Sequence, residues 1–179
     1  MVPLFTGFFR KKGLKKHSSR LQTGMIPLSG IHSATVLMDS QDSGAEKCIA
    51  EMRAFFRKAG VQPEILFIDT RSPRKRKEGP VTPEESTFLR KDLNWYGRLK
   101  NEVLSSRLGR QCDLYMDLTA RNDYPVIFIA RAVKARFKTG CTSSGDSPFD
   151  IAVTPPGQGE ASSTEMFRSM AKLLESIRI

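Results

Sequence analysis

The sequence is poor in the residues that catalysis and metal binding use most often. It has two histidines and three cysteines in 179 residues. The cysteines Cys48, Cys112 and Cys141 lie far apart and form no CxxC pair, so neither a disulfide framework nor a zinc site is indicated. His17 lies in a basic segment and His32 precedes the first predicted strand. We therefore expect no histidine-based catalysis, and the cysteine usage is typical of a cytoplasmic protein.

The sequence also lacks the short motifs that mark many phosphate and hydrolase sites. GxGxxG, the Walker A motif, GxSxG and HExxH are all absent. The turn after the first predicted strand, MDSQDSGAEK, has one glycine and two aspartates, which would repel a pyrophosphate. A receiver-domain site is compatible with Asp39 and Asp117 but lacks paired acids after the first strand and a placed lysine. Dinucleotide binding of the usual kind is excluded.

Long apolar runs are absent as well. The longest, residues 126–130, has about five residues, whereas about 20 are needed to span a bilayer. The opening residues do not form a secretory signal. We expect a cytoplasmic protein that is at most peripheral to a membrane.

Acidic residues do not occur before Asp39, and the net charge of +10 is concentrated in two short segments. The basic residues that matter here are Arg10, Lys11, Lys12, Lys15, Lys16, Arg71, Arg74, Lys75, Arg76 and Lys77. Such clusters give salt-sensitive binding to polyanions, so RNA or an anionic lipid surface is one possible partner. The alternative is that both segments are simply solvated. A DNA-reading motif does not accompany them.

Residues 1–30 are predicted to form a basic N-terminal extension and linker. The linker, RLQTGMIPLSG, is punctuated by Gly24, Pro27 and Gly30. Before it we expect a short helix that packs its phenylalanines, Phe5, Phe8 and Phe9, on the domain and leaves its basic end in solvent. The alternative is a helix on a membrane surface, which is weakened because Lys12 and Lys15 would fall within the apolar arc.

Residues 31–179 alternate short apolar strands with amphipathic helices. Strands are predicted over residues 34–39, 65–69, 86–90, 113–118, 136–140 and 150–154. The helices begin at a Ser43–Glu46 capping box, near residue 99, at Asp123 and at a Ser162–Glu165 capping box. This alternation implies right-handed βαβ units. We predict one Rossmann-like, three-layer α/β/α domain with a mostly parallel sheet of five or six strands.

Polar and aromatic side chains follow four of the predicted strands. Asp39, Asp69 and Asp117 end three strands, and the loop DLNWYG follows another. In parallel sheets, ligands bind where the carboxyl ends of the strands meet. The predicted ligand-binding residues are Asp39, Asp69, Asn94, Trp95, Tyr96 and Asp117.

Simpler interpretations of the same residues stay open. Aspartate after a strand often caps a helix or makes a turn, and Trp95 could close the sheet edge as a buried residue. The three carboxylates could also hold Mg²⁺, which binds carboxylate oxygens. We predict no cofactor and assign no metal ligand, with Mg²⁺ as the alternative.

Four motifs carry a resemblance to a known family: KDLNWYG (residues 91–97), DLYMDLT (113–119), ARFKTGC (135–141) and PFDIAV (148–153). With them the chain resembles a small bacterial family of unknown function, over essentially its whole length, and the resemblance implies no activity. The run DLYMDL, an apolar helix and KARFKTG is also similar to the N-terminal half of heptosyltransferase-type glycosyltransferases. In that family much of the nucleotide-sugar site lies in a second domain, which we do not expect in this chain.

These observations lead to one functional expectation and two alternatives. We expect a non-catalytic module that binds a small ligand or a partner protein at the carboxyl edge. The first alternative is a reduced glycosyltransferase-like enzyme half that acts on a nucleotide sugar or a sugar acceptor. The second is a basic adaptor that binds RNA or anionic lipid.

Overall fold

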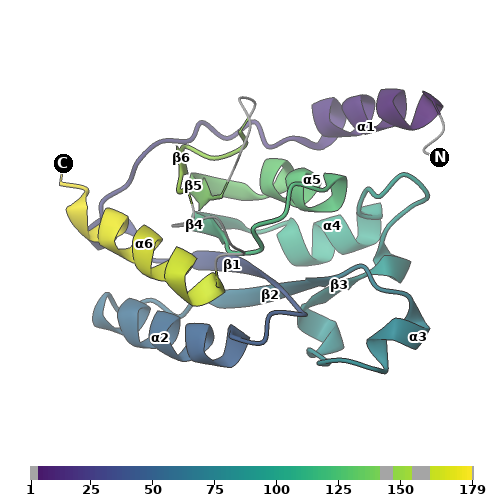
Figure 1. Cartoon of the computed structure of the whole chain (residues 1–179). Coiled ribbons are helices and arrows are strands. Elements are labelled where there is room, and N and C mark those ends of the chain that lie inside the picture. The colour runs from purple at the N-terminus through teal and green to yellow at the C-terminus, as the bar shows by residue number, and fades with distance from the viewer. Residues whose placement is uncertain (1–3, 142–146, 155–161, 179) are drawn as a thin grey trace.

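A six-stranded sheet forms the centre of the computed structural model, which describes residues 4–141, 147–154 and 162–178 (Figure 1). All neighbouring strands are parallel, and their order is β3-β2-β1-β4-β5-β6. This is the strand order of the Rossmann fold, with its switch point between β1 and β4. The predicted three-layer, Rossmann-like α/β/α architecture is confirmed, and the sheet is parallel throughout.

The elements follow one another along the chain as α1 (Leu4–His17), η1 (Leu28–Gly30), β1 (Ala34–Asp39), α2 (Ala45–Lys58), β2 (Glu64–Asp69), α3 (Pro73–Arg76), η2 (Glu84–Ser86), β3 (Thr87–Leu89), η3 (Arg90–Asp92), α4 (Asn101–Leu108), β4 (Gln111–Asp117), α5 (Tyr124–Ala132), β5 (Lys134–Gly140), β6 (Ile151–Ala152) and α6 (Ser163–Ser176).

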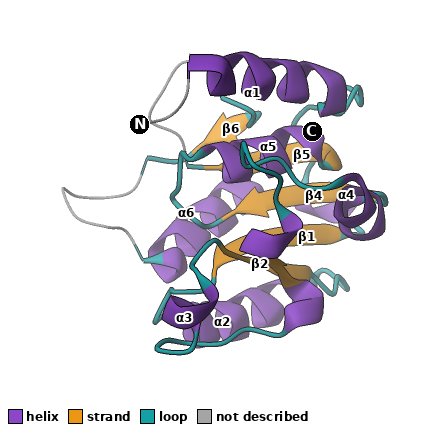
Figure 2. Ribbon diagram, turned by 90° about the vertical axis from the view of Figure 1, so that its right-hand side faces the viewer, coloured by secondary structure: helices purple, strands orange, loops and turns teal. Residues whose placement is uncertain are grey.

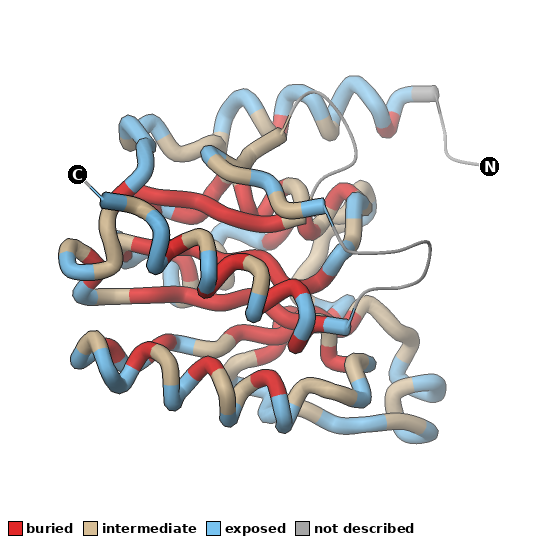
Figure 3. Tube along the Cα trace, turned by 60° about the vertical axis from the view of Figure 1, so that its left-hand side comes forward, coloured by how far each residue is buried: buried red, intermediate tan, exposed pale blue. Residues whose placement is uncertain are grey.

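Helices cover both faces of the sheet, as the turned view shows (Figure 2). Along β1, Val36 and Met38 face one cluster of apolar residues, which includes side chains of α2 and α6. Leu37 faces the other way, into a second cluster with side chains of α4 and α5. This alternation follows from the two-residue period of a strand. The buried strands run as a continuous layer between the helices (Figure 3).

The N-terminal caps of α2 and α6, the two helices that pack in the first cluster, differ from each other. At α6 the predicted capping box is present, because the Ser162 hydroxyl accepts from Glu165 N and the Glu165 carboxylate accepts from Ser162 N. At α2 the predicted Ser43–Glu46 box was wrong. Gly44 is the N-cap there, and its N–H donates to the Asp42 carboxylate at 2.8 Å, so an aspartate turn precedes the helix instead.

The interpretation of the basic segment after β2 as simply solvated was wrong in part. Ser72 caps a short helix, α3, which has Pro73 in its first turn. Arg71 and Arg76 turn inward, and both side chains reach the Asp69 carboxylate. The sequence did not reveal this because a run of charged residues looks the same whether it is solvated or paired with a buried acid.

The N-terminal helix α1 lies along α5, at the end of the molecule opposite α2 and α3 (Figures 1 and 2). Thr6, Gly13 and Leu14 are buried or half-buried on this helix, and Arg10 and His17 also contact the domain, through Tyr96 O and the Phe128 ring. The expectation that Phe5 and Phe8 pack on the domain was wrong, since both are exposed. The division of the chain at residue 30 stays a prediction. In the part of the chain that the structure describes, every helix is too short or too polar to cross a bilayer.

Candidate functional site at the carboxyl edge of the sheet

A surface cavity of about 440 Å³ lies at the carboxyl edge of the sheet. It is built from segments that are far apart in the chain: α1, the turn after β2, the segment after β3 and the start of α5. The residues that line it are Arg10, Thr70, Arg90, Leu93, Asn94, Trp95, Tyr96, Gly97, Asp123 and Pro125. Its volume falls within the range of roughly 300–1,000 Å³ that is typical of small-molecule sites.

The loop that carries the tryptophan is held by its own residues. Asn94 Oδ1 accepts hydrogen bonds from the backbone N–H groups of Tyr96 and Arg98, at 3.2 and 2.9 Å. Gly97 has a φ of +93°, which favours glycine, and its N–H donates to Asn94 O. Leu93 and Leu99 close the base of the loop as an isolated antiparallel bridge. The motif DLNWYG is therefore a turn that projects two aromatic rings.

Trp95 is largely exposed, at 66%, so its ring is available to a ligand. The interpretation of Trp95 as a buried edge residue was wrong. Its indole contacts the Tyr96 ring edge-to-face at 5.1 Å and the Phe9 ring at 5.3 Å. The Tyr96 ring in turn lies 6.3 Å from the ring of Tyr124, which is buried. A chain of aromatic contacts thus runs from solvent to the core, and Trp95 is at its outer end.

Two arginines give the cavity a positive lining. Arg10 Nε donates to Tyr96 O at 3.0 Å, and its guanidinium lies 5.0 Å from the centre of the Tyr124 ring. Arg90, just after β3, is exposed. Among the described residues neither arginine forms an ion pair with a carboxylate. Both keep donors free for an anion.

Behind the cavity, Arg121 joins three loops of the carboxyl edge. Its guanidinium binds Asp39 Oδ2 at 2.9 Å, both carboxylate oxygens of Asp123 at 2.8 Å, and Thr70 Oγ1 at 3.1 Å. Burial lowers the pKa of Arg121, but the hydrogen bonds that it donates to Asp123 and Asp39 outweigh this and raise it. Because Asp123 is engaged in this way, its side chain does not cap α5 as predicted.

Asp69, at the end of β2, is neutralised by a different arginine. Arg71 binds it through Nε and Nη2 at 2.9 and 2.8 Å, and Arg76 Nε lies 3.5 Å away. Burial alone would raise the pKa of Asp69, yet the hydrogen bonds from Arg71 hold it below the ordinary value. This carboxylate serves to order the segment after β2.

Asp117, at the end of β4, is only 3% exposed. Its Oδ1 accepts from the backbone N–H and the hydroxyl of Thr119, at 2.9 and 2.7 Å. Its Oδ2 has no hydrogen-bond partner of acceptable geometry among the described residues. Burial raises the pKa of Asp117 to about 6. Asp117 is therefore a buried group beneath the edge and does not line the cavity.

The structure brings some of the predicted site residues together and separates others. Asn94, Trp95 and Tyr96 share the cavity. Asp39, Asp69 and Asp117 end neighbouring strands on the same edge but lie outside the lining, held by arginines or by burial. Within the described ranges, groups of three or more His, Cys, Asp or Glu side chains that could hold one metal ion do not occur. The Mg²⁺ alternative gains no support from these carboxylates.

The predicted polyanion-binding residues do not form one surface. Arg10, Lys11, Lys12, Lys15 and Lys16 lie on α1, whereas Arg71–Lys77 lies near α3 at the other end of the molecule (Figures 1 and 2). In the second group, Arg71 and Arg76 are occupied by Asp69, while Arg74, Lys75 and Lys77 are exposed.

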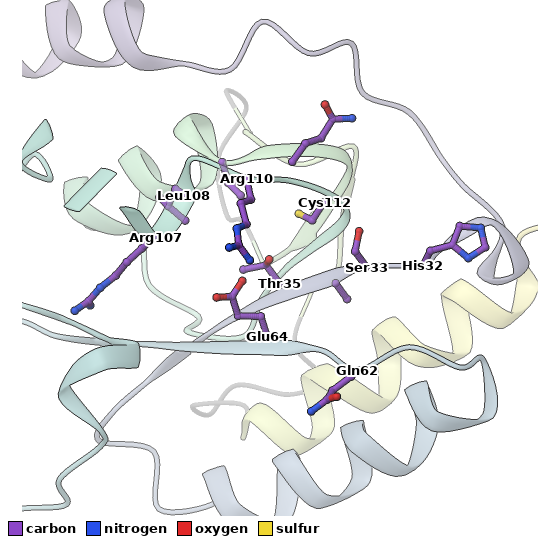
Figure 4. Close-up of a pocket in the computed structure, with 12 residues that line it drawn as sticks. His32, Ser33, Thr35, Gln62, Glu64, Arg107, Leu108, Arg110 and Cys112 are labelled. Atoms are coloured by element: carbon purple, nitrogen blue, oxygen red, sulfur yellow. The ribbon is translucent and has the colours of Figure 1, made fainter. Parts of the chain in front are cut away.

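A second, smaller cavity of about 220 Å³ lies at the amino edge of the sheet (Figure 4). The guanidinium of Arg110 points towards Thr35 and Glu64, while Arg107 extends away to donate to the Thr87 and Glu84 carbonyls. This cavity lies where β1, β2 and β4 begin, the edge opposite to the one that binds ligands in parallel α/β folds. The carboxyl-edge cavity is the better candidate.

Sequence reasoning missed the arginines that shape this edge. Arg121 follows β4 in the stretch DLTARND, where a base close to two acids hints at an ion pair but not at its partners. Arg10 was counted only as part of a basic segment, because nothing in the sequence shows that α1 reaches Tyr96. Arg90 sits beside Lys91, and only the structure shows that Lys91 turns to Glu84.

The fold and the cavity define a Rossmann-like α/β protein with a candidate ligand site at its carboxyl edge. The model of a family of unknown function (DUF6913) matches residues 7–175, so the chain belongs to this family. Searches among curated proteins and solved structures gave no match. The likeness to heptosyltransferases stays a prediction.

Proposed function

We propose that this chain is a binding module for a small anion that carries a flat ring, such as a nucleoside monophosphate, in the Trp95 cavity. The observation that carries the proposal is the lining itself. Two arginines without carboxylate partners among the described residues share one cavity with the rings of Trp95 and Tyr96.

The arginines support the anionic part of the ligand. Guanidinium groups bind phosphate and carboxylate through paired N–H donors. Arg10 is held in place by Tyr96 O and by the Tyr124 ring, so binding costs less side-chain entropy there. Asp123 also lines the cavity, but its two oxygens are taken by Arg121. Its charge is therefore partly offset by Arg121, which also binds Asp39.

The aromatic rings support the flat part of the ligand. A purine or pyrimidine stacks on an exposed indole, which is worth roughly 1–3 kcal/mol per base in nucleic-acid sites. The side-chain N–H donors of Asn94 make no hydrogen bond to any other described residue, because only its Oδ1 contributes to the turn, and they can donate to a ring oxygen or nitrogen.

The surroundings support binding without turnover. A general base must be free to take a proton, and the acids of this edge are paired with arginine or buried. His17 lies on α1 beside Arg98 and Phe128, and His32 lines the amino-edge cavity. The glycosyltransferase-like alternative would require one of these carboxylates to be released.

The experiment is a fluorescence titration, because Trp95 is the only tryptophan in the chain. UMP, AMP, uridine, inorganic phosphate and UDP-glucose are added separately to the full-length protein. We expect saturable changes in Trp95 emission with the nucleoside monophosphates, and weaker binding of uridine and of phosphate, since each supplies half of the contacts.

Arg90→Gln and Lys91→Gln form a matched pair, because each removes one positive charge and the two positions are adjacent. Arg90 lines the cavity, whereas Lys91 binds Glu84 at 3.1 Å. Arg90→Gln should weaken UMP binding on the order of tenfold, and Lys91→Gln should leave it unchanged. Equal effects, or no emission change with any compound, would contradict the proposal, and hydrolysis of UDP-glucose would replace it with the enzyme alternative.

A further inference from the structure

Helix α1 turns its large apolar side chains away from the domain. Phe5 and Phe8 are 73% and 65% exposed, while Thr6 and Gly13 of the same helix are buried against the domain. Gly13 allows this close approach, because a Cβ there would lie 2.7 Å from Tyr124 Oη. Small residues thus allow the helix to approach the domain closely, while most of the helix is exposed (Figure 3), including Phe5 and Phe8.

The outward side of α1 also carries lysines. At 3.6 residues per turn, residues 8, 11, 12 and 15 fall on the side opposite the buried positions 6 and 13, and residues 5 and 16 lie at its flanks. The exposed side chains are Phe5, Phe8, Lys11, Lys12, Lys15 and Lys16. Trp95 extends the aromatic end of this surface through Phe9, whose ring lies 5.3 Å from the indole. We call this set, with Trp95, the α1 surface.

We infer that the α1 surface docks on an anionic phospholipid bilayer. Phe and Trp side chains enter the interface between headgroups and acyl chains, and lysines next to them bind lipid phosphates and carboxylates. Here the aromatic side chains lie at the N-terminal end of the helix and the lysines follow it. The molecule therefore docks with the N-terminal end of α1 deepest in the bilayer, and the lysines lie at the level of the headgroups.

The arrangement of the rings favours a lipid surface over RNA. Single-stranded RNA binds where bases stack on successive exposed ring faces. On the α1 surface the rings meet edge-to-face, with interplanar angles of 81° between Phe8 and Phe9 and 72° between Phe9 and Trp95. Such a cluster does not offer the series of parallel ring faces that single-stranded RNA uses, although Trp95 alone can stack one flat ring at the cavity.

The experiment is flotation of the full-length protein with vesicles of phosphatidylcholine alone or of phosphatidylcholine mixed with phosphatidylserine. We expect binding only to the mixed vesicles, and loss of binding as salt is raised. Each lysine near an anionic surface contributes roughly fivefold in affinity. Lys12→Gln/Lys15→Gln/Lys16→Gln together should therefore weaken binding on the order of 100-fold.

A matched control removes the same charge elsewhere. Arg74→Gln/Lys75→Gln/Lys77→Gln alters three exposed residues near α3, at the other end of the molecule, and should leave vesicle binding nearly unchanged. Phe5→Ser/Phe8→Ser keeps the charge and should also weaken binding, by about tenfold or more.

Equal losses in the two triple variants would show that only net charge matters and would overturn the proposal. So would full binding by the phenylalanine variant, or binding to a single-stranded RNA with no binding to vesicles. Circular dichroism of each variant shows whether the fold is retained. Lys91→Gln leaves the α1 surface unaltered and serves as the reference.

Discussion

Arg121 and Asp39 link the two strands at the switch point of the sheet, with 2.9 Å between Nη1 and Oδ2. Asp39 ends β1 and Arg121 follows β4, so the contact bridges residues 82 positions apart. The same guanidinium also holds Asp123 and Thr70, which line the cavity. The shape of the candidate site therefore depends on a side chain that does not line it.

Replacing Arg121 should destabilise the fold and weaken ligand binding. The Arg121 and Asp39 side chains are 22% and 18% exposed, so Arg121→Ala leaves a poorly solvated carboxylate and should cost roughly 2 kcal/mol in the free energy of unfolding. Urea denaturation measures this, and a double-mutant cycle with Asp39→Asn isolates the pair. Arg168→Ala is the control, because its pair with Glu51 is more exposed and should contribute less to stability. A cost no larger than that of the control would show that Arg121 does not hold the edge together.

The buried Asp117 predicts a particular dependence of stability on pH. Its pKa is raised from 3.8 to about 6, so the folded chain keeps a proton that the unfolded chain releases. Stability from this group is full below about pH 4 and is lost as the pH rises to about 6. The difference between the two values corresponds to roughly 3 kcal/mol.

Asp117→Asn removes this titration while nearly keeping the shape of the side chain. The free energy of unfolding of the variant, minus that of the original chain, should therefore increase between about pH 4 and pH 7. Chemical denaturation at several pH values gives the difference directly. Parallel stability profiles for the two proteins would mean that Asp117 is not held in its protonated form by the fold.

Two glycines of α1 should respond in opposite ways to the same substitution. Alanine is better than glycine inside a helix by about 1 kcal/mol. Gly7 has open space around it, so Gly7→Ala should stabilise α1. At Gly13 the new Cβ would meet Tyr124 Oη at 2.7 Å, so Gly13→Ala should lose this gain and loosen the helix. Hydrogen exchange of the α1 amides compares the two, and equal protection would contradict the docking of α1 on Tyr124.

Gly97→Ala tests the turn that projects Trp95. A side chain at φ +93° is strained, and its Cβ would lie 3.4 Å from Pro125 and Tyr124, so we expect a loss of roughly 1–2 kcal/mol and a changed Trp95 emission. Gly60→Ala is a matched control, because Gly60 also has a positive φ, of +71°, but has no atom near its Cβ and lies after α2. It should destabilise the fold without affecting Trp95. The same emission change in both variants would argue that the loop is not built around Gly97.

The sequence predicted the sheet well because its strands are short apolar runs bounded by polar residues. The short apolar run ATVLMD of β1 is typical of a buried strand. Parallel pairing then follows from the intervening helices, and it places the ends of β1, β2 and β4 on one edge. The Trp95 loop follows β3, which pairs parallel with β2, so it lies near the same edge.

The sequence could not predict which acids stay free, because pairing is decided in three dimensions. Asp69 meets Arg71 two residues later, a contact that a local reading permits, but Asp39 meets Arg121 across the sheet. The orientation of α1 could not be predicted from the sequence for a similar reason. Apolar residues usually face the core, yet here the space next to Tyr124 admits only glycine at position 13 and turns Phe5 and Phe8 outward.

The most direct test of the central claim is an NMR titration of the full-length protein with UMP, following the single indole N–H signal of Trp95 together with the backbone amides. If the carboxyl-edge cavity binds the ligand, the indole signal and the amides of Asn94 and Gly97 shift together and saturate. Shifts confined to His32, Glu64 and Cys112, which line the amino-edge cavity, would contradict the account, as would an indole signal that does not move at any concentration of UMP.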